Sequence, residues 1–358
     1  MHTDLTNFCI HQSKSILDAV TLMDSNGLGI VLVVDGDSRL LGTITDGDVR
    51  RALLANMDLT QLVTVLVASK EGSRYARPIT ASPGSDPETY LNLLRENSIL
   101  HLPLLDKDQR VVGLVSLDEF LPERVVPRQA VIMAGGQGNR MRPLTEEIPK
   151  PMLPVGDQPL MEIIIQQLRD AGIKRVNVTT HHKSEKITEH FGDGRNFGVE
   201  LSYVTEDRPL GTAGALGLME TPQDTILVIN GDILSHVNFR AMLSFHREHQ
   251  GDLTMAVRQY DVQVPFGVVE CQGSSVLSLN EKPTLNCFVN AGIYLLEPLV
   301  YRYIPNGRPF DMTDLIQRLL KEGRRVVSFP ILEYWLDIGL PDDYLKAQKD
   351  VMTWKTRR

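Results

Sequence analysis

A glycine-rich loop flanked by basic side chains occurs within residues 131–154, and this combination is suited to binding phosphate. Glycine has no side chain, so its backbone N–H group can approach phosphate oxygens closely. Downstream, Arg140 offers a fork of donors and Lys150 a point charge, and we expect both to act as catalytic groups on a triphosphate. The residues expected to contact the nucleotide from the loop itself are Ala134, Gly135, Gly136 and Gly138.

Three kinds of phosphate loop compete for this segment. A Walker loop ends in Gly-Lys-Ser/Thr, which is absent here. A dinucleotide fingerprint needs a third glycine three residues after Gly138, where the sequence has Met141. A nucleoside triphosphate loop with Arg140 on the phosphates remains.

Two aspartates far apart in the sequence are candidates for a metal site. Asp232 follows an apolar run and a glycine, so its carboxylate is expected at the carboxyl edge of a strand, and Asp337 lies close to Trp335. Two carboxylates from distant segments are the usual protein share of a Mg²⁺ site, which phosphates and water complete. A turn-forming role is the alternative for Asp232 alone. We therefore predict Mg²⁺ on Asp232 and Asp337.

The elements that must position these residues alternate in type along residues 129–350. Apolar runs of strand length alternate with helical patterns, including a helix from about 160 to 171. This alternation predicts an α/β domain whose mostly parallel sheet is covered on both faces. Ligands of such sheets bind beyond the carboxyl ends of the strands. The expected strands are 130–134, 176–180, 201–204 and 225–229.

The first third of the chain contains an internal repeat. Residues 35–48 align without a gap on residues 106–119, with an offset of 113 − 42 = 71 at the shared glycines. Each copy has two strands around a tight turn and then a helix start, and amphipathic stretches at 15–23 and 87–94 precede the copies. One such unit cannot bury its own apolar face, so two should pack together.

This repeat resembles a tandem pair of CBS domains (β-α-β-β-α) over residues 1–122. The family's ribose and phosphate motif is complete in the first copy as Gly42, Thr45 and Asp48. The second copy has Ser116 but departs from the motif at Glu119. The resemblance implies an adenine nucleotide on Thr45, Asp48 and Ser116. The alternative is that both motifs only cap helices.

Residues 129–350 resemble the sugar-1-phosphate nucleotidyltransferases, with a linker at 123–128 and a tail at 351–358. Besides the loop, the motifs that carry the resemblance are 142–145, 149–154, 210–215, 230–232, 265–270, 281–283, 290–294 and 335–339. The resemblance implies a GT-A-like, Rossmann-related fold and Mg²⁺-dependent attack of a sugar 1-phosphate on the α-phosphorus of an NTP. The nucleophile is already anionic, so no general base is needed.

The resemblance also assigns roles to residues outside the loop. Lys282 corresponds to the lysine that holds the sugar phosphate, and Glu281 to the carboxylate that binds sugar hydroxyls. A surface turn before Pro283 is the alternative for this pair. The remaining residues implied are Gly211 and Thr212 for the nucleotide and Gly267, Asn290 and Trp335 for the sugar.

Glu206 bears on the choice of base. It lies four residues before Leu210 and by register faces the base edge, where one carboxylate can accept both N1–H and N2–H₂ of guanine. Uracil and thymine present carbonyl oxygens, which a carboxylate repels, so GTP is favoured over UTP or dTTP. A solvated acidic loop is the alternative.

The whole arrangement is most similar to the CBS-containing glucosamine-1-phosphate guanylyltransferases of legionaminic-acid synthesis. Mannose- or heptose-1-phosphate guanylyltransferases and a UTP- or dTTP-using enzyme are alternatives within the family. A non-catalytic adenine-nucleotide sensor is the alternative outside it.

Composition limits the remaining possibilities. Lys+Arg 37 against Asp+Glu 45 gives a net charge of −8, which argues against a protein that coats nucleic acid. The three cysteines are far apart and have no metal-ligand spacing. Apolar runs are too short to span a bilayer, and the first residues lack a signal pattern. We expect a soluble, cytoplasmic protein and, from the CBS resemblance, a homo-oligomer.

Overall fold

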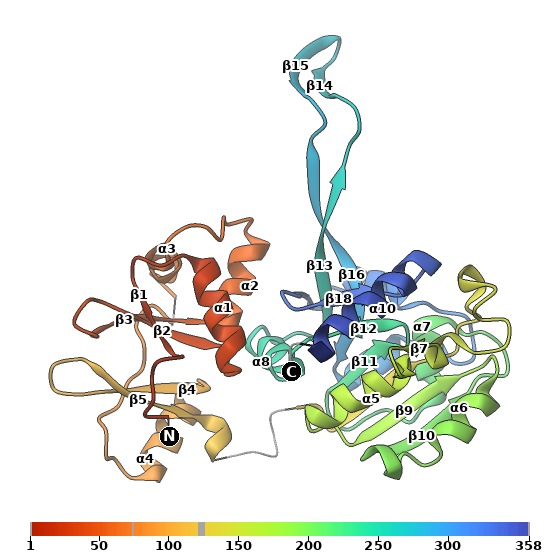
Figure 1. The fold of residues 1–358 in the computed structure, drawn as a ribbon, viewed down its shortest axis with the longest axis horizontal. Helices are drawn as coiled ribbons and strands as arrows, with labels where there is room; N and C mark the ends of the chain where they lie inside the picture. Colours follow the sequence, from red (N-terminus) through yellow and green to blue (C-terminus); the bar gives the residue numbers. More distant parts are fainter. Residues whose placement is uncertain (1, 74, 121–125, 357–358) are drawn as a thin grey trace. The chain divides into compact units, whose positions relative to one another are not determined.

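The chain divides into two compact units, residues 1–125 and 126–358. The computed structural model describes residues 2–73, 75–120 and 126–356 (Figure 1). The predicted linker at 123–128 therefore lies partly outside the described residues. Within the described residues, no helix has the length and apolar character needed to cross a membrane.

The first unit contains two small sheets, β1-β2-β3 and β4-β5, with helices packed around them. The predicted amphipathic stretches are helices, and both begin with a side-chain cap: Ser15 caps the first and Asp86 the second. The elements are β1 (Cys9–His11), α1 (Ile16–Asn26), β2 (Ile30–Val34), β3 (Leu40–Thr45), α2 (Asp46–Leu54), α3 (Val63–Ala68), α4 (Pro87–Glu96), β4 (His101–Leu105), β5 (Val111–Ser116) and η1 (Leu117–Glu119).

The two copies of the repeat contact each other symmetrically. The N–H of Leu40 donates to the carbonyl of Gln109, and the N–H of Val111 donates to the carbonyl of Ser38, both at 3.1 Å. At the repeat offset of 71, Leu40 corresponds to Val111 and Ser38 to Gln109, so the two bonds are equivalent. Ser38 and Gln109 also share a left-handed φ of 63°. The repeat predicted from the sequence is thus a structural repeat whose turns pair with each other.

The second unit is built on a seven-stranded sheet in the order β10-β9-β6-β11-β16-β13-β17. All neighbouring pairs are parallel except those of β16, which is antiparallel to β11 and β13. The predicted mixed, mostly parallel sheet is therefore confirmed. Its strands are β6 (Gln129–Met133), β9 (Arg175–Thr180), β10 (Glu200–Thr205), β11 (Ile226–Asn230), β13 (Leu253–Gln263), β16 (Thr284–Leu296) and β17 (Val326–Pro330).

Helices cover both faces of this sheet, which explains why its central strands are apolar at consecutive positions. On one face, Ile132 and Ile229 pack with residues of α5, α6 and α8. On the other, Val131 and Val228 pack with α7 and α9. The helices are α5 (Leu160–Asp170), α6 (Ser184–Phe191), α7 (Gly211–Gly214), α8 (Phe239–Glu248), α9 (Met312–Lys321) and α10 (Pro341–Thr356), with η2 (Asn139–Met141), η3 (Lys150–Met152), η4 (Arg195–Phe197), η5 (Ala215–Leu218) and η6 (Pro298–Tyr303) between them.

Smaller elements lie beside the sheet. A third core cluster joins Met141 after the glycine loop to Leu234, Leu336 and Val351. Because α10 continues to Thr356 and buries Val351, residues 351–356 are part of the second unit rather than the tail expected at 351–358. The strand pairs here are β7 (Pro154–Val155) with β8 (Gln158–Pro159) and β12 (Ile233–Ser235) with β18 (Trp335–Asp337).

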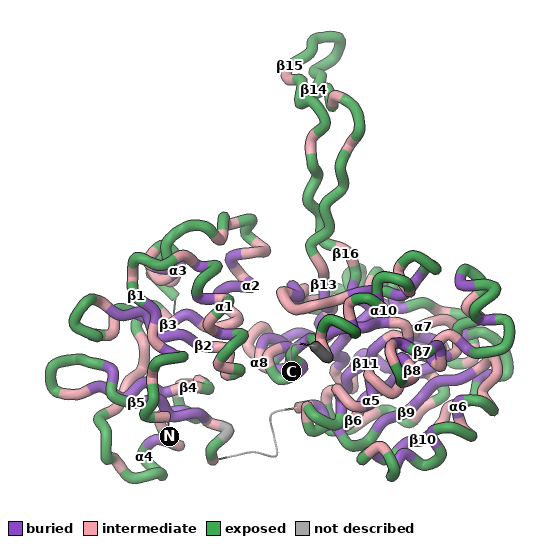
Figure 2. The backbone as a smooth tube through the Cα atoms, viewed as in Figure 1, coloured by how far each residue is buried: buried purple, intermediate pink, exposed green. Residues whose placement is uncertain are grey.

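The outer halves of β13 and β16 leave the sheet together and form a long ribbon (Figure 1). At its end lies the hairpin of β14 (Val268–Gln272) and β15 (Ser275–Asn280). Nearly all of this ribbon is exposed (Figure 2).

Candidate active site

The glycine-rich loop follows β6 at the carboxyl end of the parallel strands. Ala134 is held by its N–H, which donates to the carbonyl of Thr179 at 3.0 Å. Gly138 adopts a φ of 65°, and a Cβ there would lie 3.0 Å from Cγ2 of the buried Thr145. The Thr145 hydroxyl donates to the Gly138 carbonyl at 2.8 Å. The loop is thus supported on one side by Thr145.

The other side of the loop is open. A Cβ on Gly136 would meet no atom within 4 Å. Within the described part of the chain, the N–H groups of residues 135–138 donate to no protein acceptor. Successive free N–H groups in a turn are typical of anion-binding concavities.

Lys150 and Arg140 differ in their surroundings. Lys150 starts η3, is 11% exposed, and donates from Nζ to Oδ2 of Asp232 at 2.6 Å. Arg140 is exposed, and among the described residues it has no hydrogen bond or ion pair. Its positive charge nevertheless acts on Asp337, where it partly offsets the effects that raise the pKa of that carboxyl. Arg140 is therefore available to an anionic ligand, while Lys150 already neutralises a carboxylate.

Asp232 and Asp337 lie close enough to affect each other electrostatically. Between β11 and Asp232, the N–H of Gly231 donates to the Met133 carbonyl at 2.9 Å, and a Cβ at Gly231 would lie 2.9 Å from the same oxygen. The strand pair β12/β18 then places Ile233 opposite Asp337. Although part of Asp337 is exposed to solvent, desolvation by the surrounding protein, and after it the Asp232 carboxylate, raises its pKa to about 6 against the opposing effect of Lys150 and Arg140.

This carboxylate pair fits a divalent cation with hard oxygen ligands. Among the described residues there is no cluster of three or more His, Cys, Asp or Glu side chains that could hold a metal by itself. Asp232 and Asp337 would therefore need phosphate oxygens and water to complete the octahedron that Mg²⁺ requires.

Glu206 lies directly against the glycine-rich loop. It is 6% exposed, and its Oε2 accepts the N–H of Leu210 at 2.8 Å. A Cβ on Gly135 would lie 2.5 Å from Oε1, so only glycine is compatible with this contact. Burial raises the pKa of Glu206, although the Leu210 N–H and His181 act in the opposite direction. The other oxygen, Oε1, accepts no hydrogen bond from the described residues and can accept one from a ligand next to the loop.

Gly211 and Thr212 have a structural role in this conformation. Gly211 has a φ of 77°, and a Cβ there would lie 2.5 Å from Oδ1 of Asp311. The N–H of Thr212 donates to Asp311 at 3.1 Å, and its hydroxyl accepts from the N–H of Met312 at 2.8 Å. Both residues therefore fasten α7 to the start of α9.

The residues expected on the sugar side separate into two groups. Trp335 lies in β18, two residues before Asp337, and its Nε1 donates to the carbonyl of Ala291 at 2.9 Å. Asn290 accepts the N–H of Gly292 at 3.1 Å and donates to the Tyr294 hydroxyl at 2.8 Å. These two residues are held near the carboxylate pair by β16 and β18.

Gly267, Glu281 and Lys282 lie far out on the exposed ribbon. Thr284 is six residues before Asn290 on β16, which is a separation of roughly 20 Å along an extended strand. Gly267 and Glu281 face each other there, since a Cβ on Gly267 would lie 2.9 Å from Oε2 of Glu281. The structure thus does not bring these three residues to Asp232 and Asp337 (Figure 1).

Two lysines that the sequence did not single out hold the segment after the glycine loop. Lys183, just before α6, donates from Nζ to the carbonyls of Thr145 (3.0 Å) and Glu146. Lys186 donates to the carbonyl of Glu147 at 2.6 Å. Three consecutive carbonyls between Arg140 and Lys150 are therefore tied to one helix start. No local pattern predicts this, because the donors and acceptors are 37 to 39 residues apart.

In the first unit, the CBS motif residues cap helices. Asp48 is 3% exposed and accepts the N–H and hydroxyl of Thr45 at 2.8 and 3.0 Å. It also pairs with Arg51 at 2.7 Å and Lys70 at 2.8 Å. In the second copy, the N–H of buried Ser116 donates to Glu119 at 3.2 Å. In this conformation Asp48 is engaged by the cap and by two cations, as the capping alternative expects.

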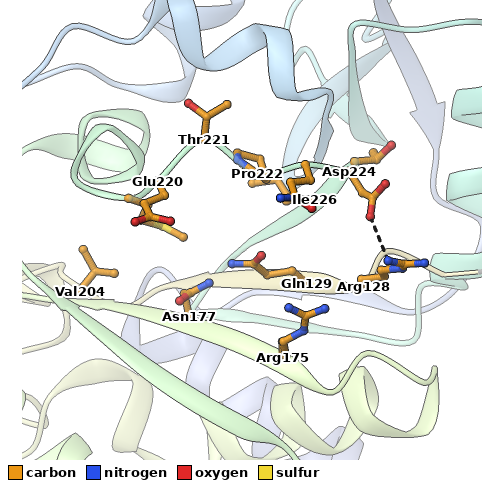
Figure 3. Close-up of a pocket in the computed structure, with 13 residues that line it drawn as sticks. Arg128, Gln129, Arg175, Asn177, Val204, Glu220, Thr221, Pro222, Asp224 and Ile226 are labelled. Carbon is orange, nitrogen blue, oxygen red and sulfur yellow. Dashed lines mark ion pairs between the residues drawn. The ribbon is translucent and has the colours of Figure 1, made fainter.

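A cavity of about 470 Å³ lies at the opposite ends of the strands (Figure 3). It is lined by the first residues of β6 and β9, including Arg175 and Asn177, and by the loop from Met219 to Thr225. Arg128 and Asp224 form an exposed ion pair of 3.6 Å at its rim. Its two arginines are balanced by Glu220 and Asp224, and it shares no residue with the predicted site.

The comparisons with known proteins agree with this geometry. The Nucleotidyl transferase family model matches residues 129–353, and the CBS domain model matches residues 1–55 and 75–124. A mannose-1-phosphate guanylyltransferase of Mycobacterium tuberculosis is 34% identical over 231 residues, covering 62% of this chain and 64% of that protein. A D-glycero-alpha-D-manno-heptose 1-phosphate guanylyltransferase of Aneurinibacillus thermoaerophilus is 32% identical, covering 62% of this chain and 98% of that protein.

A solved structure agrees as well. A putative glucose-1-phosphate thymidylyltransferase from Bacillus anthracis superposes with a TM-score of 0.51 at 27% identity, covering 62% of this chain and 94% of that one. The family model spans well over half of the residues, and it covers the loop, both aspartates and the exposed ribbon. The chain therefore belongs to the nucleotidyl transferase family and carries a pair of CBS domains ahead of its nucleotidyl transferase domain.

Proposed function

We propose that the chain transfers a nucleotidyl group from an NTP to a sugar 1-phosphate, giving an NDP-sugar and pyrophosphate. The observation that carries the proposal is the meeting of Lys150, Asp232 and Asp337 at the end of a loop with four free N–H groups. An anion cradle beside two carboxylates suits a metal-bound triphosphate.

In this reaction, a sugar-phosphate oxygen forms a bond to the α-phosphorus while the bond to the pyrophosphate oxygen breaks. The loop N–H groups and the exposed Arg140 bind the triphosphate and stabilise the charge that develops on it. Lys150 holds Asp232 in place and would also contact the phosphates. Mg²⁺, held by Asp232 and Asp337, would supply further charge neutralisation. The attacking phosphate is anionic, so the chain needs to position it rather than deprotonate it.

GTP is the proposed nucleotide. Glu206 supports this choice because one of its oxygens is fixed by Leu210 and the other remains beside Gly135. A carboxylate can accept both N1–H and N2–H₂ of guanine, whereas it repels the carbonyl oxygens of uracil and thymine. The names of the mycobacterial and heptose-specific relatives also favour guanylyl transfer. A relative from Synechocystis sp. is called a UTP–glucose-1-phosphate uridylyltransferase, so UTP or dTTP is the competing choice.

Glucosamine 1-phosphate, as in legionaminic-acid synthesis, is the proposed acceptor. Mannose 1-phosphate and heptose 1-phosphate are competing acceptors, supported by the names of the relatives. The chain spans 64% of the length of the mycobacterial relative and 63% of the length of the Synechocystis relative. The names of these relatives therefore support a choice of substrate only in part. For Lys282 and Glu281 to bind the sugar phosphate, the ribbon would have to come closer to an Asp232–Asp337 pair than it does in this structure.

The test is a matrix of four NTPs against glucosamine, mannose, glucose and heptose 1-phosphates, read by pyrophosphate release with Mg²⁺ and with EDTA. We expect turnover that requires Mg²⁺ and is fastest with GTP and glucosamine 1-phosphate. Turnover with GTP and a different sugar would revise only the acceptor. No turnover with any pair would reject the proposal in favour of a non-catalytic nucleotide sensor.

A further inference from the structure

The exposed ribbon, which we call the arm (residues 259–288), carries an unusual concentration of apolar side chains. Their exposed fractions are 73% for Phe266, 64% for Val276, 58% for Leu277, 64% for Leu279, 55% for Tyr260 and 51% for Leu285. A two-stranded ribbon alone in water is marginally stable at best. The arm therefore needs a surface that covers these side chains.

The apolar residues are sorted onto one face of the arm near its base. In an antiparallel pair, directly opposite residues project to the same face. Tyr260 pairs with Cys287, and Val262 pairs with Leu285. We call these four residues the apolar arm face. The pairs that alternate with them are Gln259–Phe288, Asp261–Asn286 and Gln263–Thr284, which are polar except for Phe288.

The hairpin at the end of the arm is sorted less completely. Val269 pairs with Leu279, and the neighbouring pair Glu270–Ser278 on the other face is polar, although exposed Val268 and Val276 alternate onto that face as well. The side chain of Ser278 donates to Glu270 at 3.1 Å. One-sided amphipathicity is typical of a ribbon that lies on another apolar surface.

The size of the uncovered surface points to a protein–protein interface. Ten of the 23 large apolar side chains that are exposed among the described residues lie within the 30 residues of the arm. Concentrations of this kind on a soluble protein mark interaction sites. The other thirteen are divided among several elements of both units, and three of them, Leu340, Leu345 and Met352, lie at or in α10.

We propose that the arm pairs with the arm of a second copy of this chain, apolar arm face against apolar arm face. The face bears no charged residue, so it is complementary to itself, as a two-fold interface requires. The rest of its own unit exposes seven large apolar side chains among the described residues, against ten in the arm. The proposal uses no catalytic property and does not depend on the proposed function.

The test uses the full chain with Cys9→Ser and Cys271→Ser, so that Cys287 on the apolar arm face is the remaining thiol. Its reaction rate with a thiol reagent is measured across a hundredfold range of protein concentration, together with the mass in solution. We expect Cys287 to react at least tenfold more slowly at high concentration, where the dimer forms. Val262→Glu with Leu285→Glu should remove this protection and halve the mass.

Gln263→Glu with Thr284→Glu is the matched control, because it places the same charges on the polar face. It should keep both the protection and the mass, and thermal melts should show that both double variants fold. Protection that does not change with concentration in a protein of monomer mass would mean that the arm lies on its own domain. A thiol that reacts rapidly throughout, or a dimer unaffected by Val262→Glu with Leu285→Glu, would equally overturn the proposal.

Discussion

Nζ of Lys150 lies 2.6 Å from Oδ2 of Asp232, although 82 residues separate them in the sequence. The ammonium therefore neutralises one of the two carboxylates that would hold Mg²⁺. Asp337 forms no ion pair among the described residues, and desolvation, followed by the Asp232 carboxylate, raises its pKa to about 6. A metal bound by Asp232 and Asp337 would compete with Lys150 for Asp232, which would free Lys150 for the phosphates.

Lys150→Gln should separate these two roles of the lysine. Without the competing ammonium, Mn²⁺ should bind the NTP-free protein roughly tenfold more tightly, equivalent to about 1.4 kcal/mol. Turnover should fall by about 100-fold because the triphosphate loses a cation. Spin-resonance titration of Mn²⁺ measures the first effect and pyrophosphate release the second. Lys150→Arg, which keeps the charge, should show wild-type metal affinity. Weaker Mn²⁺ binding by Lys150→Gln would contradict the competition.

Asp337→Asn should stabilise the second unit while removing activity. Burial and Asp232 raise the pKa of Asp337 above its unfolded value, so the folded state binds the proton more tightly. The ionised carboxyl therefore destabilises the fold fully above about pH 6, and this effect disappears below about pH 4. The Tm of the variant should exceed that of the wild type by about 3 °C at pH 7.5.

The gain in Tm should shrink at pH 4.5, where wild-type Asp337 is largely protonated. Asp170→Asn, at an exposed site on α5, serves as the control and should show no such pH dependence. A gain that is equal at both pH values would mean that Asp337 does not carry the effect.

The sequence predicted those features that depend on local patterns. The strands ending near Ala134 and Asn230 are apolar throughout, and their parallel pairing brings the glycine loop and Asp232 to one edge. The repeat offset likewise predicted two copies that contact each other. Long-range partners left no such signal: Lys70 lies 22 residues from Asp48, and Lys183 lies 38 from Thr145.

The arm could not be predicted because alternation in a strand does not reveal what covers its apolar face. Val262 and Leu285 have the pattern of a half-buried ribbon, yet both are exposed. The motif around Lys282 was expected to hold the sugar phosphate, and the register of β13 and β16 places it far along the ribbon.

Glu206→Gln should shift the base preference. The amide oxygen can still accept the N–H of Leu210, so the loop from 206 to 210 should keep its shape. The amide nitrogen would then meet the donors of guanine but suit the carbonyl oxygens of uracil. We expect kcat/KM for GTP to fall by about 100-fold and that for UTP to rise. Asp207→Asn, at the exposed neighbouring position, should leave the ratio unchanged. An unchanged GTP:UTP ratio in Glu206→Gln would remove Glu206 from base selection.

Lys183→Met with Lys186→Met should loosen the segment that joins Arg140 to Lys150. The carbonyls of residues 145–147 would lose their ammonium donors, and Thr145 would support Gly138 less firmly. A positioning role predicts a rise of about tenfold in KM for the NTP, with a smaller change in kcat. Lys183→Arg with Lys186→Arg should recover most of the loss, and the exposed Lys174→Met is the control. A fall in kcat alone would point instead to direct contact with the reacting groups.

Asp48→Asn should destabilise the first unit through Lys70 rather than through the helix cap. Burial raises the pKa of Asp48, but Lys70, Thr45 and Arg51 outweigh it, so the pKa lies below its usual range. This stabilisation is present above about pH 4 and is lost as the pH falls through the folded pKa. Asn keeps an acceptor for the cap but leaves the 12%-exposed Lys70 without its charged partner, at a cost of about 3 kcal/mol near pH 7.

Asp18→Asn is the matched control, because Asp18 forms the same capping box with Ser15 and has no lysine bound to it among the described residues. Denaturant unfolding should therefore show a large loss for Asp48→Asn and a small one for Asp18→Asn, and equal losses would assign the effect to capping alone.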